Sequence, residues 1–372
     1  MERKNILYIH GGGDVIGGIE KWLAATIGKH KKYEPYIAVV RRGAVYEHFE
    51  RTGLSVHDLH GGRIKEVIKT IGAIKECMKI IDRHDIECVI GNGPHAWLYA
   101  GIISRITHKK SIFVVHNEIK KSDFSHIIQG ASFRIKPTLY VANSRFTQKS
   151  VIKYLGDKCY LNYPGADRSI YDEINKNETR MSMSRALGID PEMKIFLLAG
   201  RLQEWKGQDV AIRAFRSMKN RDGAILLIAG DISFRKDEKF KKKLLELARG
   251  CENIKFLGER YDIPELMKAS DIILHTTRTP EPFGMVVAEG MMAGKPVIAT
   301  KQGGPMEMID DGLDGFLVEP YKPEKLASLM DVLSEDAERR LEVGAKAYIK
   351  AREKFSAQSS VDNLEKILDE VI

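Results

Sequence analysis

Short apolar runs along the chain alternate with longer segments whose apolar residues recur at helical spacing. In the first half these runs cover residues 5–9, 36–40, 87–90, 111–115 and 139–142. Continuously apolar strands of this kind are typical of a parallel sheet that is buried on both faces. A helical pattern over about residues 19–29 follows the first run. The first half therefore predicts a series of βαβ units.

The same pattern starts again in the second half, with runs over residues 194–199, 224–229, 254–257, 272–275 and 296–299. Two consecutive βαβ series predict an α/β protein with two doubly wound, Rossmann-like domains. The length agrees, because 372 residues are too many for one hydrophobic core. We place the boundary in the polar stretch Asp167–Asp190. Apolar residues at helical spacing between Val361 and Ile372 predict a closing helix.

The four cysteines are scattered and form no Cys-x-x-Cys pair. This spacing favours a reducing compartment and gives no sign of a disulfide framework or a zinc site. No apolar run reaches the roughly 18–20 residues that span a bilayer. The chain passes from Met1-Glu-Arg-Lys4 directly into a strand-like run, so we expect no signal peptide and a cytoplasmic location.

The net charge of +8 is unevenly distributed along the chain. Residues 1–160 hold 26 Lys and Arg against 15 Asp and Glu, or +11, which leaves 33 against 36, or −3, for the remainder. Basic positions gather at Lys29–Lys32, between Arg63 and Lys79, at Lys109–Lys110 and at Lys120–Lys121. They indicate either an ordinary solvated surface or docking onto an anionic membrane or nucleic acid. Few aromatic residues lie among them, which argues against binding of single-stranded nucleic acid.

A basic loop, Arg201-Leu-Gln-Glu-Trp-Lys206-Gly207, follows the strand-like run 194–199. Ligands of open α/β sheets bind outside the carboxyl ends of the strands, where this loop would lie. Arg201 can grip a phosphate with two N–H groups, and Lys206 can act as a mobile point charge. The loop therefore predicts a diphosphate clamp, with an ordinary basic surface loop as the alternative.

Two carboxylates flank a Phe-Gly turn in the segment Glu281-Pro-Phe-Gly-Met-Val-Val-Ala-Glu289. The turn predicts a helix start, whose free N–H groups form an anion site between two groups that can each bind hydroxyls. If the whole segment were helical, the two carboxylates would lie about 12 Å apart. That separation exceeds the roughly 5–9.5 Å of a glycoside hydrolase pair. The segment instead predicts a nucleotide-sugar site.

Two strand ends of the first half carry further candidates. Gly17 and Gly18 lie in the loop after the first strand, but the spacing of the glycines there is not Gly-x-Gly-x-x-Gly. We expect close backbone approach to a sugar diphosphate, with a flexible strand–helix turn as the alternative. His116 ends another predicted strand and would face the cleft, unless it only caps a loop. His10 is a weaker candidate, and we expect His275 to be structural or near the nucleotide.

In combination these motifs resemble the family-4 retaining glycosyltransferases of the GT-B fold. The resemblance rests on the basic loop, the two glutamates and Gly303-Gly304-Pro305-x-Glu307, and more weakly on Gly17–Lys21 and Val141–Thr147. It implies a closing helix that returns to the first domain, giving domains at residues 1–170 plus 355–372 and at 171–354. It also implies a cleft between an acceptor domain and a nucleotide-sugar domain.

The resemblance implies a role for each candidate residue. Arg201 and Lys206 would hold the diphosphate and stabilise the leaving group, Glu289 would bind the ribose, and Glu281 would contact the sugar. His116 would lie at the reacting centre, while Gly17 and Gly18 would touch the donor. Backbone N–H groups at Phe283, Gly284, Met285 and Val286 would complete the donor site. No metal is expected, because the Arg–Lys pair replaces it and the chain has no Asp-x-Asp motif.

We therefore expect a retaining hexosyltransferase that uses a UDP- or GDP-type sugar, with the departing phosphate as base and no other cofactor. Its acceptor would be a glycan, a lipid-linked glycan or a small molecule, and the basic first domain predicts peripheral binding to the inner face of a membrane. The alternatives are an enzyme for a small soluble acceptor and a non-catalytic nucleotide-sugar-binding protein. Nucleic acid is not expected as a partner. Trp97, Tyr99 and Phe124 can be core residues or stacking surfaces, and the nucleobase is expected near Leu257–Tyr261.

Overall fold

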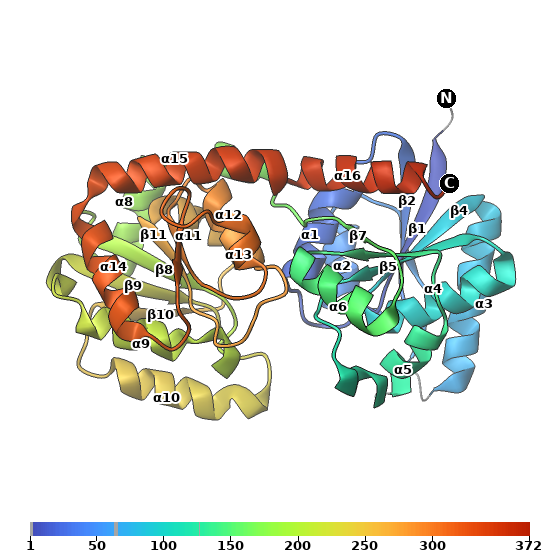
Figure 1. Ribbon diagram of the computed structural model, residues 1–372, viewed down its shortest axis with the longest axis horizontal. Coiled ribbons are helices and arrows are strands. Elements are labelled where there is room, and N and C mark those ends of the chain that lie inside the picture. The colour runs from blue at the N-terminus through green and yellow to red at the C-terminus, as the bar shows by residue number, and fades with distance from the viewer. Residues whose placement is uncertain (1–2, 63–65, 126) are drawn as a thin grey trace. The chain divides into compact units, whose positions relative to one another are not determined.

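A computed structural model of the chain describes residues 3–62, 66–125 and 127–372. The chain forms two compact units (Figure 1), of which unit 1 comprises residues 1–165 and 357–372 and unit 2 comprises residues 166–356. These divisions lie five residues before the predicted boundary after residue 170 and two residues after the predicted one at 354. Arg63 and Lys65, two of the predicted basic positions, lie outside the described residues.

Unit 1 is built around a parallel sheet of seven strands in the order β3-β2-β1-β4-β5-β6-β7. The strands are β1 (Lys4–His10), β2 (Tyr33–Val39), β3 (Val56–Asp58), β4 (Ile86–Asn92), β5 (Lys110–Val115), β6 (Leu139–Ala142) and β7 (Cys159–Leu161). The helices are α1 (Gly18–Ile27), α2 (Ala44–Glu50), α3 (Val67–Arg83), α4 (Pro94–Thr107), α5 (Ile127–Arg134), α6 (Arg145–Leu155) and α16 (Ala357–Asp369). The sequence pattern missed β3 and β7 and, in the second half of the chain, β13 (Phe316–Val318), because strands of three residues are too short to stand out as apolar runs.

Unit 2 has a parallel sheet of six strands in the order β10-β9-β8-β11-β12-β13. Its strands are β8 (Lys194–Ala199), β9 (Ala224–Ala229), β10 (Ile254–Gly258), β11 (Ile272–His275), β12 (Val297–Thr300) and β13 (Phe316–Val318). Its helices are α7 (Arg168–Asp172), α8 (Lys176–Leu187), α9 (Gln208–Ser217), α10 (Glu238–Ala248), α11 (Ile263–Ala269), α12 (Met285–Met292), α13 (Pro305–Met308), α14 (Pro323–Glu335) and α15 (Ala337–Lys354). The polar stretch that predicted the boundary forms α7 and α8 within this unit.

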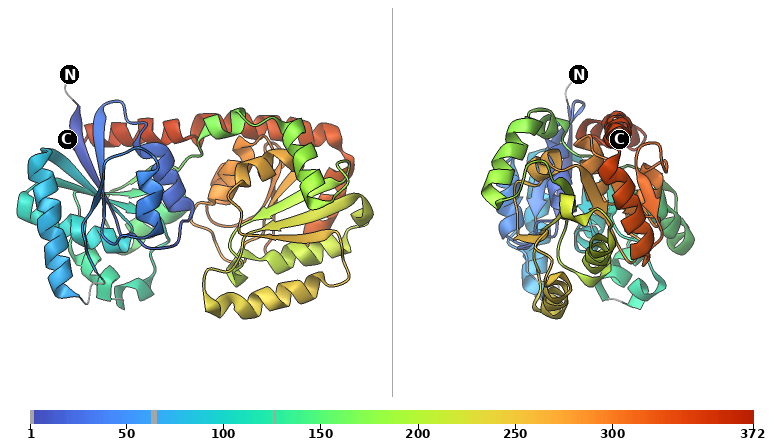
Figure 2. Two further views of the ribbon diagram at one scale, coloured as in Figure 1. Left: turned by 180° about the vertical axis from the view of Figure 1, so that it is seen from behind. Right: turned by 90° about the vertical axis from the view of Figure 1, so that its left-hand side faces the viewer.

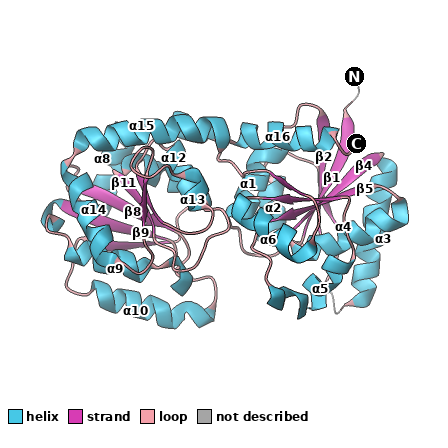
Figure 3. Ribbon diagram, in the orientation of Figure 1, coloured by secondary structure: helices cyan, strands magenta, loops and turns pink. Residues whose placement is uncertain are grey.

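In each unit the strands form a twisted central layer with helices packed against it (Figures 2 and 3). The inner strands are largely buried, as β9 illustrates, where all six residues from Ala224 to Ala229 are buried, whereas the edge strands β3, β7, β10 and β13 are mostly half-buried. This burial explains why the strands read as continuous apolar runs and why the two doubly wound domains could be predicted. Within the described part of the chain, no helix combines the length and apolar character needed to cross a bilayer.

The closing helix α16 belongs to unit 1, although α15 directly before it belongs to unit 2. It packs against α1, where the Trp22 indole donates a hydrogen bond of 3.1 Å to the hydroxyl of Ser360. The sequence pattern predicted this helix from Val361, and the structure begins it at Ala357. The extra turn is polar, which explains why it carried no apolar signal.

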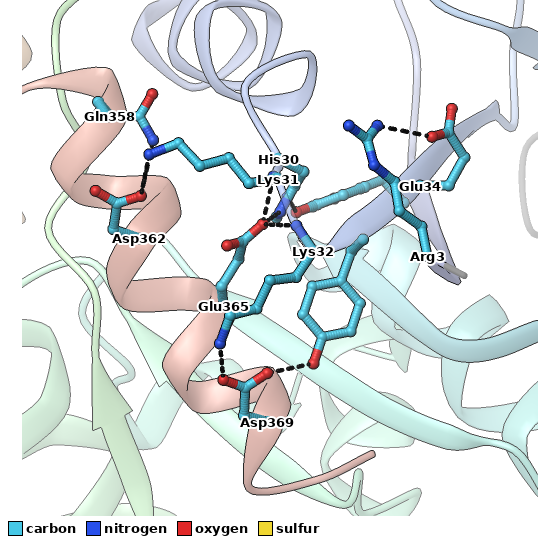
Figure 4. A network of polar contacts seen from close by, with 11 residues as sticks. Arg3, His30, Lys31, Lys32, Glu34, Gln358, Asp362, Glu365 and Asp369 are labelled. Carbon is cyan, nitrogen blue, oxygen red and sulfur yellow. Dashed lines mark hydrogen bonds and ion pairs between the residues drawn. The ribbon is translucent and has the colours of Figure 1, made fainter. Parts of the chain in front are cut away.

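A buried carboxylate on α16, that of Glu365, forms the centre of this contact (Figure 4). Its Oε1 accepts the backbone N–H groups of Lys31 at 2.7 Å and Lys32 at 3.0 Å, and it lies 3.1 Å from Nδ1 of His30. His30 Nε2 lies 2.8 Å from the hydroxyl of Tyr8. Burial outweighs the carboxylate and lowers the pKa of His30. The neutral ring therefore links α16 to the sheet, donating to Glu365 and accepting from Tyr8.

Candidate functional site

The carboxyl ends of β8 and β11 lie side by side in the sheet of unit 2, since these strands pair in parallel. The loop after β8 carries Arg201 and ends in the short helix η2 (Glu204–Lys206), and the loop after β11 leads to Glu281. The two loops are tied together by the N–H of Arg278, which donates to the carbonyl of Trp205 at 2.7 Å. The predicted diphosphate loop and the predicted sugar-binding glutamate therefore share one edge of the sheet.

Lys206, Glu281 and His275 form a cluster of charged and polar groups at this edge. The Lys206 ammonium lies 3.0 Å from Oε1 and 2.8 Å from Oε2 of Glu281. Nε2 of His275 lies 3.0 Å from the same Oε2. Because a carboxylate only accepts, His275 donates through Nε2, and its buried Nδ1 has no partner among the described residues. His275, expected to be structural or near the nucleotide, thus holds the sugar-binding candidate directly.

The carboxylate of Glu281 is held in its charged form. Burial by itself would raise its pKa, but Lys206 and His275 oppose this and lower the pKa to about 2. A carboxylate has roughly four lone-pair positions, and three are occupied by these contacts. Glu281 can therefore accept one further hydrogen bond from a ligand and cannot serve as an acid near neutral pH.

Lys206 is also fixed from its other side. Its ammonium lies over the indole of Trp205, 4.1 Å from the ring centroid, and that indole donates to Gln203 at 3.1 Å. The next residue, Gly207, adopts a φ of +69°, and a Cβ at this position would lie 1.9 Å from the carbonyl oxygen of Thr276. Only glycine allows this close passage of the two loops. The lysine is thus a positioned charge rather than a mobile one.

The backbone of Glu281 packs directly against the Gly303–Gly304 pair. Glu281 and Gly303 form an isolated parallel bridge, and the N–H of Gly304 donates to the carbonyl of Glu281 at 2.8 Å. A Cβ on Gly303 would lie 2.3 Å from that carbonyl oxygen, and one on Gly304 would lie 2.4 Å from the carbonyl oxygen of Phe283. The two glycines therefore let the segment 281–283 pack against the loop after β12.

Helix α12 begins at Met285 with Gly284 as its N-cap, at a φ of +100°. Glu281 thus precedes the helix, while Glu289 lies inside it, so the segment is not one continuous helix as the 12 Å estimate supposed. Phe283 is buried against Phe355, whereas Met285 and Val286 are half-buried at the first turn. The N–H groups of the first turn lie at the helix start where the sequence predicted an anion site, which stays a prediction.

Glu289 and Arg201 differ in their surroundings. Glu289 is half-buried in α12, and its charge contributes to raising the pKa of the buried hydroxyl of Tyr171, after burial itself. Arg201 is exposed, and only its carbonyl is engaged, as the acceptor of a 2.8 Å hydrogen bond from Gln208. No described side chain pairs with its guanidinium. The predicted Arg–Lys clamp therefore consists of one ion-paired lysine and one unpaired arginine.

Unit 1 holds a cavity of about 220 Å³ at the carboxyl ends of β1, β4 and β5. His116 lines it and is buried, with Nε2 3.3 Å from Oδ1 of Asn92 and its ring edge-on to Trp22 at 5.7 Å. Burial lowers the pKa of His116 to about 4, although Glu20 opposes the shift. His116 is therefore neutral at physiological pH and lines a cavity within unit 1, while its predicted place in the cleft stays a prediction.

The first glycine loop is organised by Glu20 of α1. Its Oε2 accepts the N–H of Gly17 at 2.8 Å, and its Oε1 lies 3.2 Å from Nε2 of His10. Burial would raise the pKa of Glu20, but the contacts with His10 lower it. Gly17 is the N-cap of α1 and Gly18 its first residue. The N–H of Gly17 is therefore already engaged, and any contact of this loop with a donor would rest on its other atoms.

Three residues of these two sites escaped the sequence analysis as candidates: Glu20, Asn92 and His95. Each lies at a strand end or in a first helical turn and lines the cavity of unit 1. Asn92 is the last residue of β4, so the carboxyl-end rule could have singled it out. Glu20 stands three residues after the N-cap, a capping-box spacing that by itself indicates only a helix start.

The remaining aromatic and basic candidates have mixed surroundings. Trp97 and Tyr99 are buried in the core cluster of unit 1, where the Trp97 indole donates to the carbonyl of Val114 at 3.0 Å, and Trp97 also lines the cavity. Phe124 is 41% exposed. In the segment predicted to hold the nucleobase, Tyr261 is 86% exposed and free to stack, and Arg260 pairs with Asp262 at 2.8 Å. Among the described residues, no group of three or more His, Cys, Asp or Glu could hold a metal ion.

Comparisons with known families match most of the chain in two segments. Residues 180–350 match the family described as "Glycosyl transferases group 1", and residues 16–169 match "Glycosyltransferase Family 4". A D-inositol 3-phosphate glycosyltransferase of Corynebacterium jeikeium (strain K411) is 31% identical over 215 residues, which are 56% of this chain and 51% of the relative. The chain thus spans about half the length of the curated relatives it matches.

Solved structures resemble the whole chain. Anabaena Alr3699/HepE in complex with UDP-glucose is 25% identical, with a TM-score of 0.85 over 98% of this chain and 99% of that one. WaaG, a glycosyltransferase involved in lipopolysaccharide biosynthesis, is 18% identical, with a TM-score of 0.70 over 98% and 99% of the two chains. The similarity to WaaG shows a shared fold only.

Proposed function

We propose that the protein transfers a hexose-type sugar from a nucleoside-diphosphate sugar, because residues 16–169 and 180–350 match glycosyltransferase family models and the fold is GT-B. The observation that carries the proposal is the Lys206–Glu281–His275 cluster beside the start of α12. It offers a fixed cation for phosphate, a fixed carboxylate for a hydroxyl, and the backbone N–H groups of the first turn of α12 between them. The UDP-glucose complex of the HepE relative supports a donor of this class.

In the proposed donor site, Arg201 and Lys206 bind the diphosphate and Glu289 accepts from the ribose. Glu281 uses its remaining lone pair for a sugar hydroxyl, and the backbone at Phe283, Gly284, Met285 and Val286 lies against sugar and phosphate. Gly17, Gly18 and His116 of unit 1 are proposed as further donor contacts. Such positioned charges stabilise the negative charge that builds on a leaving diphosphate. No metal is needed for that stabilisation, because two cations supply it.

The proposed reaction breaks the bond between the anomeric carbon and the β-phosphate oxygen and forms a bond to an acceptor hydroxyl oxygen. The hydroxyl proton passes to the departing phosphate, so no protein base is required. Attack from the face that the phosphate leaves would retain the anomeric configuration. Glu281 fits this scheme as a binding group, since a carboxylate held ionised by Lys206 and His275 has little tendency to take up a proton.

The test is release of nucleoside diphosphate from a panel of UDP- and GDP-sugars, with and without cell lysate as acceptor. We expect Lys206→Ala to lower the rate by about 10²–10³, the cost of one electrostatic group at a developing charge. Lys206→Arg should retain part of the rate, and Lys325→Ala, a surface lysine of α14, should retain all of it. Unchanged turnover in Lys206→Ala would refute the proposed roles. Donor binding without turnover in the unchanged protein would favour the non-catalytic alternative.

The membrane part of the proposal rests on one face of α3. Ile68, which is 87% exposed, and Ile71, 49% exposed, precede Lys75 and Lys79 along one line of this helix. Residues three and four apart share a helix face, so this face combines apolar and basic side chains with one exposed carboxylate, that of Asp82. We propose that it docks on the anionic inner face of a membrane and so brings unit 1 to a lipid-linked acceptor.

Co-sedimentation with vesicles of phosphatidylcholine alone or with phosphatidylserine tests this docking. Binding should require the anionic lipid, weaken with salt, and fall at least fivefold in Ile68→Ser/Lys75→Glu. Ile349→Ser on α15 is the matched control, because that residue is 56% exposed but lies in unit 2. Binding that ignores lipid charge would reject membrane docking and favour a small soluble acceptor.

A further inference from the structure

Helix α15 carries a row of exposed apolar side chains on the outside of unit 2. Its inner face packs against α12 (Figure 1), and Val343 and Ala347 on that face are buried. Leu341 is 67% exposed, Ile349 is 56% exposed, and Ala345 between them is exposed as well. Since residues four apart share a helix face, these three form one continuous row. A continuous apolar row, unlike a single exposed apolar residue, indicates a contact surface for another molecule.

A charged residue lies at each end of this row. Glu338 precedes Leu341 by three residues, and Arg352 follows Ile349 by the same number. Both charged side chains are exposed, and neither forms an ion pair within the described part of the chain. The Arg352 guanidinium lies over the ring of Tyr348, 5.5 Å from its centroid. Each end of the row therefore offers a partner a charge that has no ion pair of its own.

These side chains are arranged symmetrically about Ala345. At about 100° per residue, Ala345 lies at the centre of the exposed face, and the other members of the set lie within about 40° of it. The apolar Leu341 and Ile349 are four positions away on either side. The acidic Glu338 and the basic Arg352 are seven positions away on either side. In an antiparallel pair with two-fold symmetry, positions equally far from the centre lie opposite each other, so this face is complementary to itself.

The charges beside the row argue against an anionic partner. Three carboxylates, those of Glu338, Glu342 and Glu353, lie on or next to this face. Of the basic side chains there, Lys346 is already paired with Glu342 at 2.5 Å, which leaves Arg352. The face therefore lacks the basic excess that attracts an anionic membrane or a nucleic acid. A second copy of the chain, by contrast, brings an arginine to Glu338.

We infer that this face of α15 joins two copies of the chain in an antiparallel homodimer, with the two-fold axis at Ala345. Leu341 of each copy packs against Ile349 of the other, and the small Ala345 side chains allow the helix axes to approach closely. Glu338 of each copy pairs with Arg352 of the other. The contact covers residues 338–352, about 21 Å of helix, so it is smaller than a standard interface and the dimer is weak. The inference does not rest on the proposed transferase function.

Sedimentation velocity of the intact protein over a range of concentrations tests the inference. We expect the dimer fraction to rise with concentration, as it does for a weak reversible contact. Leu341→Glu places a charge against Ile349 of the second copy and should weaken dimerisation at least tenfold. Leu245→Glu is the matched control, because that residue is 47% exposed on α10, a helix that packs against α9. It should leave dimerisation unchanged.

Reversal of the end charges tests the antiparallel register. Glu338→Arg and Arg352→Glu should each weaken dimerisation at least fivefold, because like charges then face each other at both ends of the row. The double variant Glu338→Arg/Arg352→Glu should dimerise like the unchanged protein. An equimolar mixture of the two single variants should form mixed dimers, since opposite charges meet again at both ends. All of these positions are exposed, and thermal unfolding of each variant checks that the fold is kept.

Three results would overturn the inference. The first is a protein that stays monomeric at every concentration. The second is a dimer that Leu341→Glu leaves intact, or a Leu341→Glu variant that loses binding to phosphatidylserine vesicles instead of dimerisation, which would assign the face to a membrane. The third is failure of both the double variant and the mixture to restore the dimer. Donor turnover that depends on Lys206 would survive each of these results.

Discussion

The two candidate sites satisfy their polar groups in opposite ways. In unit 2, Lys206, Glu281 and His275 pair with one another before any ligand is present, and Glu281 is held ionised. In unit 1, the cavity is lined by the neutral imidazole of His116 and by Asn92, whose amide N–H has no described partner. The first site is a preformed charge array, suited to an anionic leaving group. The second depends on a ligand to complete its hydrogen bonds.

The largest effect is expected from breaking the charge array. Glu281→Gln leaves the Lys206 ammonium, only 17% exposed, without its carboxylate. Removing one partner of such a buried pair costs about 3–5 kcal/mol. Urea unfolding followed by hydrogen exchange should show this loss in residues 166–356 and little change in residues 1–165. Nucleoside diphosphate binding should persist while transfer falls at least 100-fold, and equal losses in both units would contradict the comparison.

Lowering the pH should destabilise unit 1 before unit 2, with a smaller effect than Glu281→Gln. Within the described residues, the imidazoles whose pKa is lowered by burial all lie in unit 1: His30, His48, His57, His95 and His116. For His116 alone, with a pKa of about 4 against 6.5 unfolded, the stability lost as the pH falls from 6.5 to 4 is about 3 kcal/mol. As the pH falls, the unfolded state takes up the proton first, so the free energy of unfolding decreases.

Glu281 has the corresponding effect in unit 2 at lower pH. Its pKa of about 2 lies below the ordinary value, so its contribution is complete above pH 4.5 and is lost as the pH falls toward 2. Hydrogen exchange between pH 7 and 4 should therefore show unit 1 opening first. His116→Gln should flatten that change, and earlier opening of unit 2 would contradict the assignment of these pKa shifts.

Substitution of Gly207 in unit 2 and of Gly17 in unit 1 compares how tightly the two loops are packed. Gly207→Ala puts a Cβ at a φ of +69° and within 1.9 Å of the carbonyl oxygen of Thr276. We expect a loss of about 2–3 kcal/mol, from backbone strain and the forced separation of two loops. Thermal unfolding and donor turnover should both fall. A variant that keeps its stability and turnover would show that the loops do not need this close passage.

The smallest effect is expected at Gly17, in the loop of unit 1. Its φ of −122° is open to any residue, and a Cβ would meet only Oε2 of Glu20 at 3.2 Å. Gly17→Ala should cost less than about 1 kcal/mol, since the end of a flexible side chain can move. If calorimetry and donor KM both change strongly, the loop has the close donor contact that the sequence analysis predicted.

The sequence predicted the folds of both units but the sites unequally, for a physical reason. The candidates of unit 2 lie within two short segments, 201–206 and 275–289, so their chemistry is visible as local spacing. The cavity of unit 1 draws His10, Glu20, Asn92, His95 and His116 from separate strand ends and helix starts. No local motif connects them. Even in unit 2, the pairing of His275 with Glu281 depends on side-chain directions that spacing cannot give.

The return of α16 to unit 1 has a consequence for how the protein is made. The 191 residues of unit 2, from 166 to 356, are translated between the two parts of unit 1. At roughly 5–20 residues per second, the first part waits about 10–40 s for its last helix. During that time Trp22, His30 and Tyr33 have no α16 to cover them. Unit 1 can therefore complete its fold only after unit 2 has been translated, whereas unit 2 is continuous in the chain.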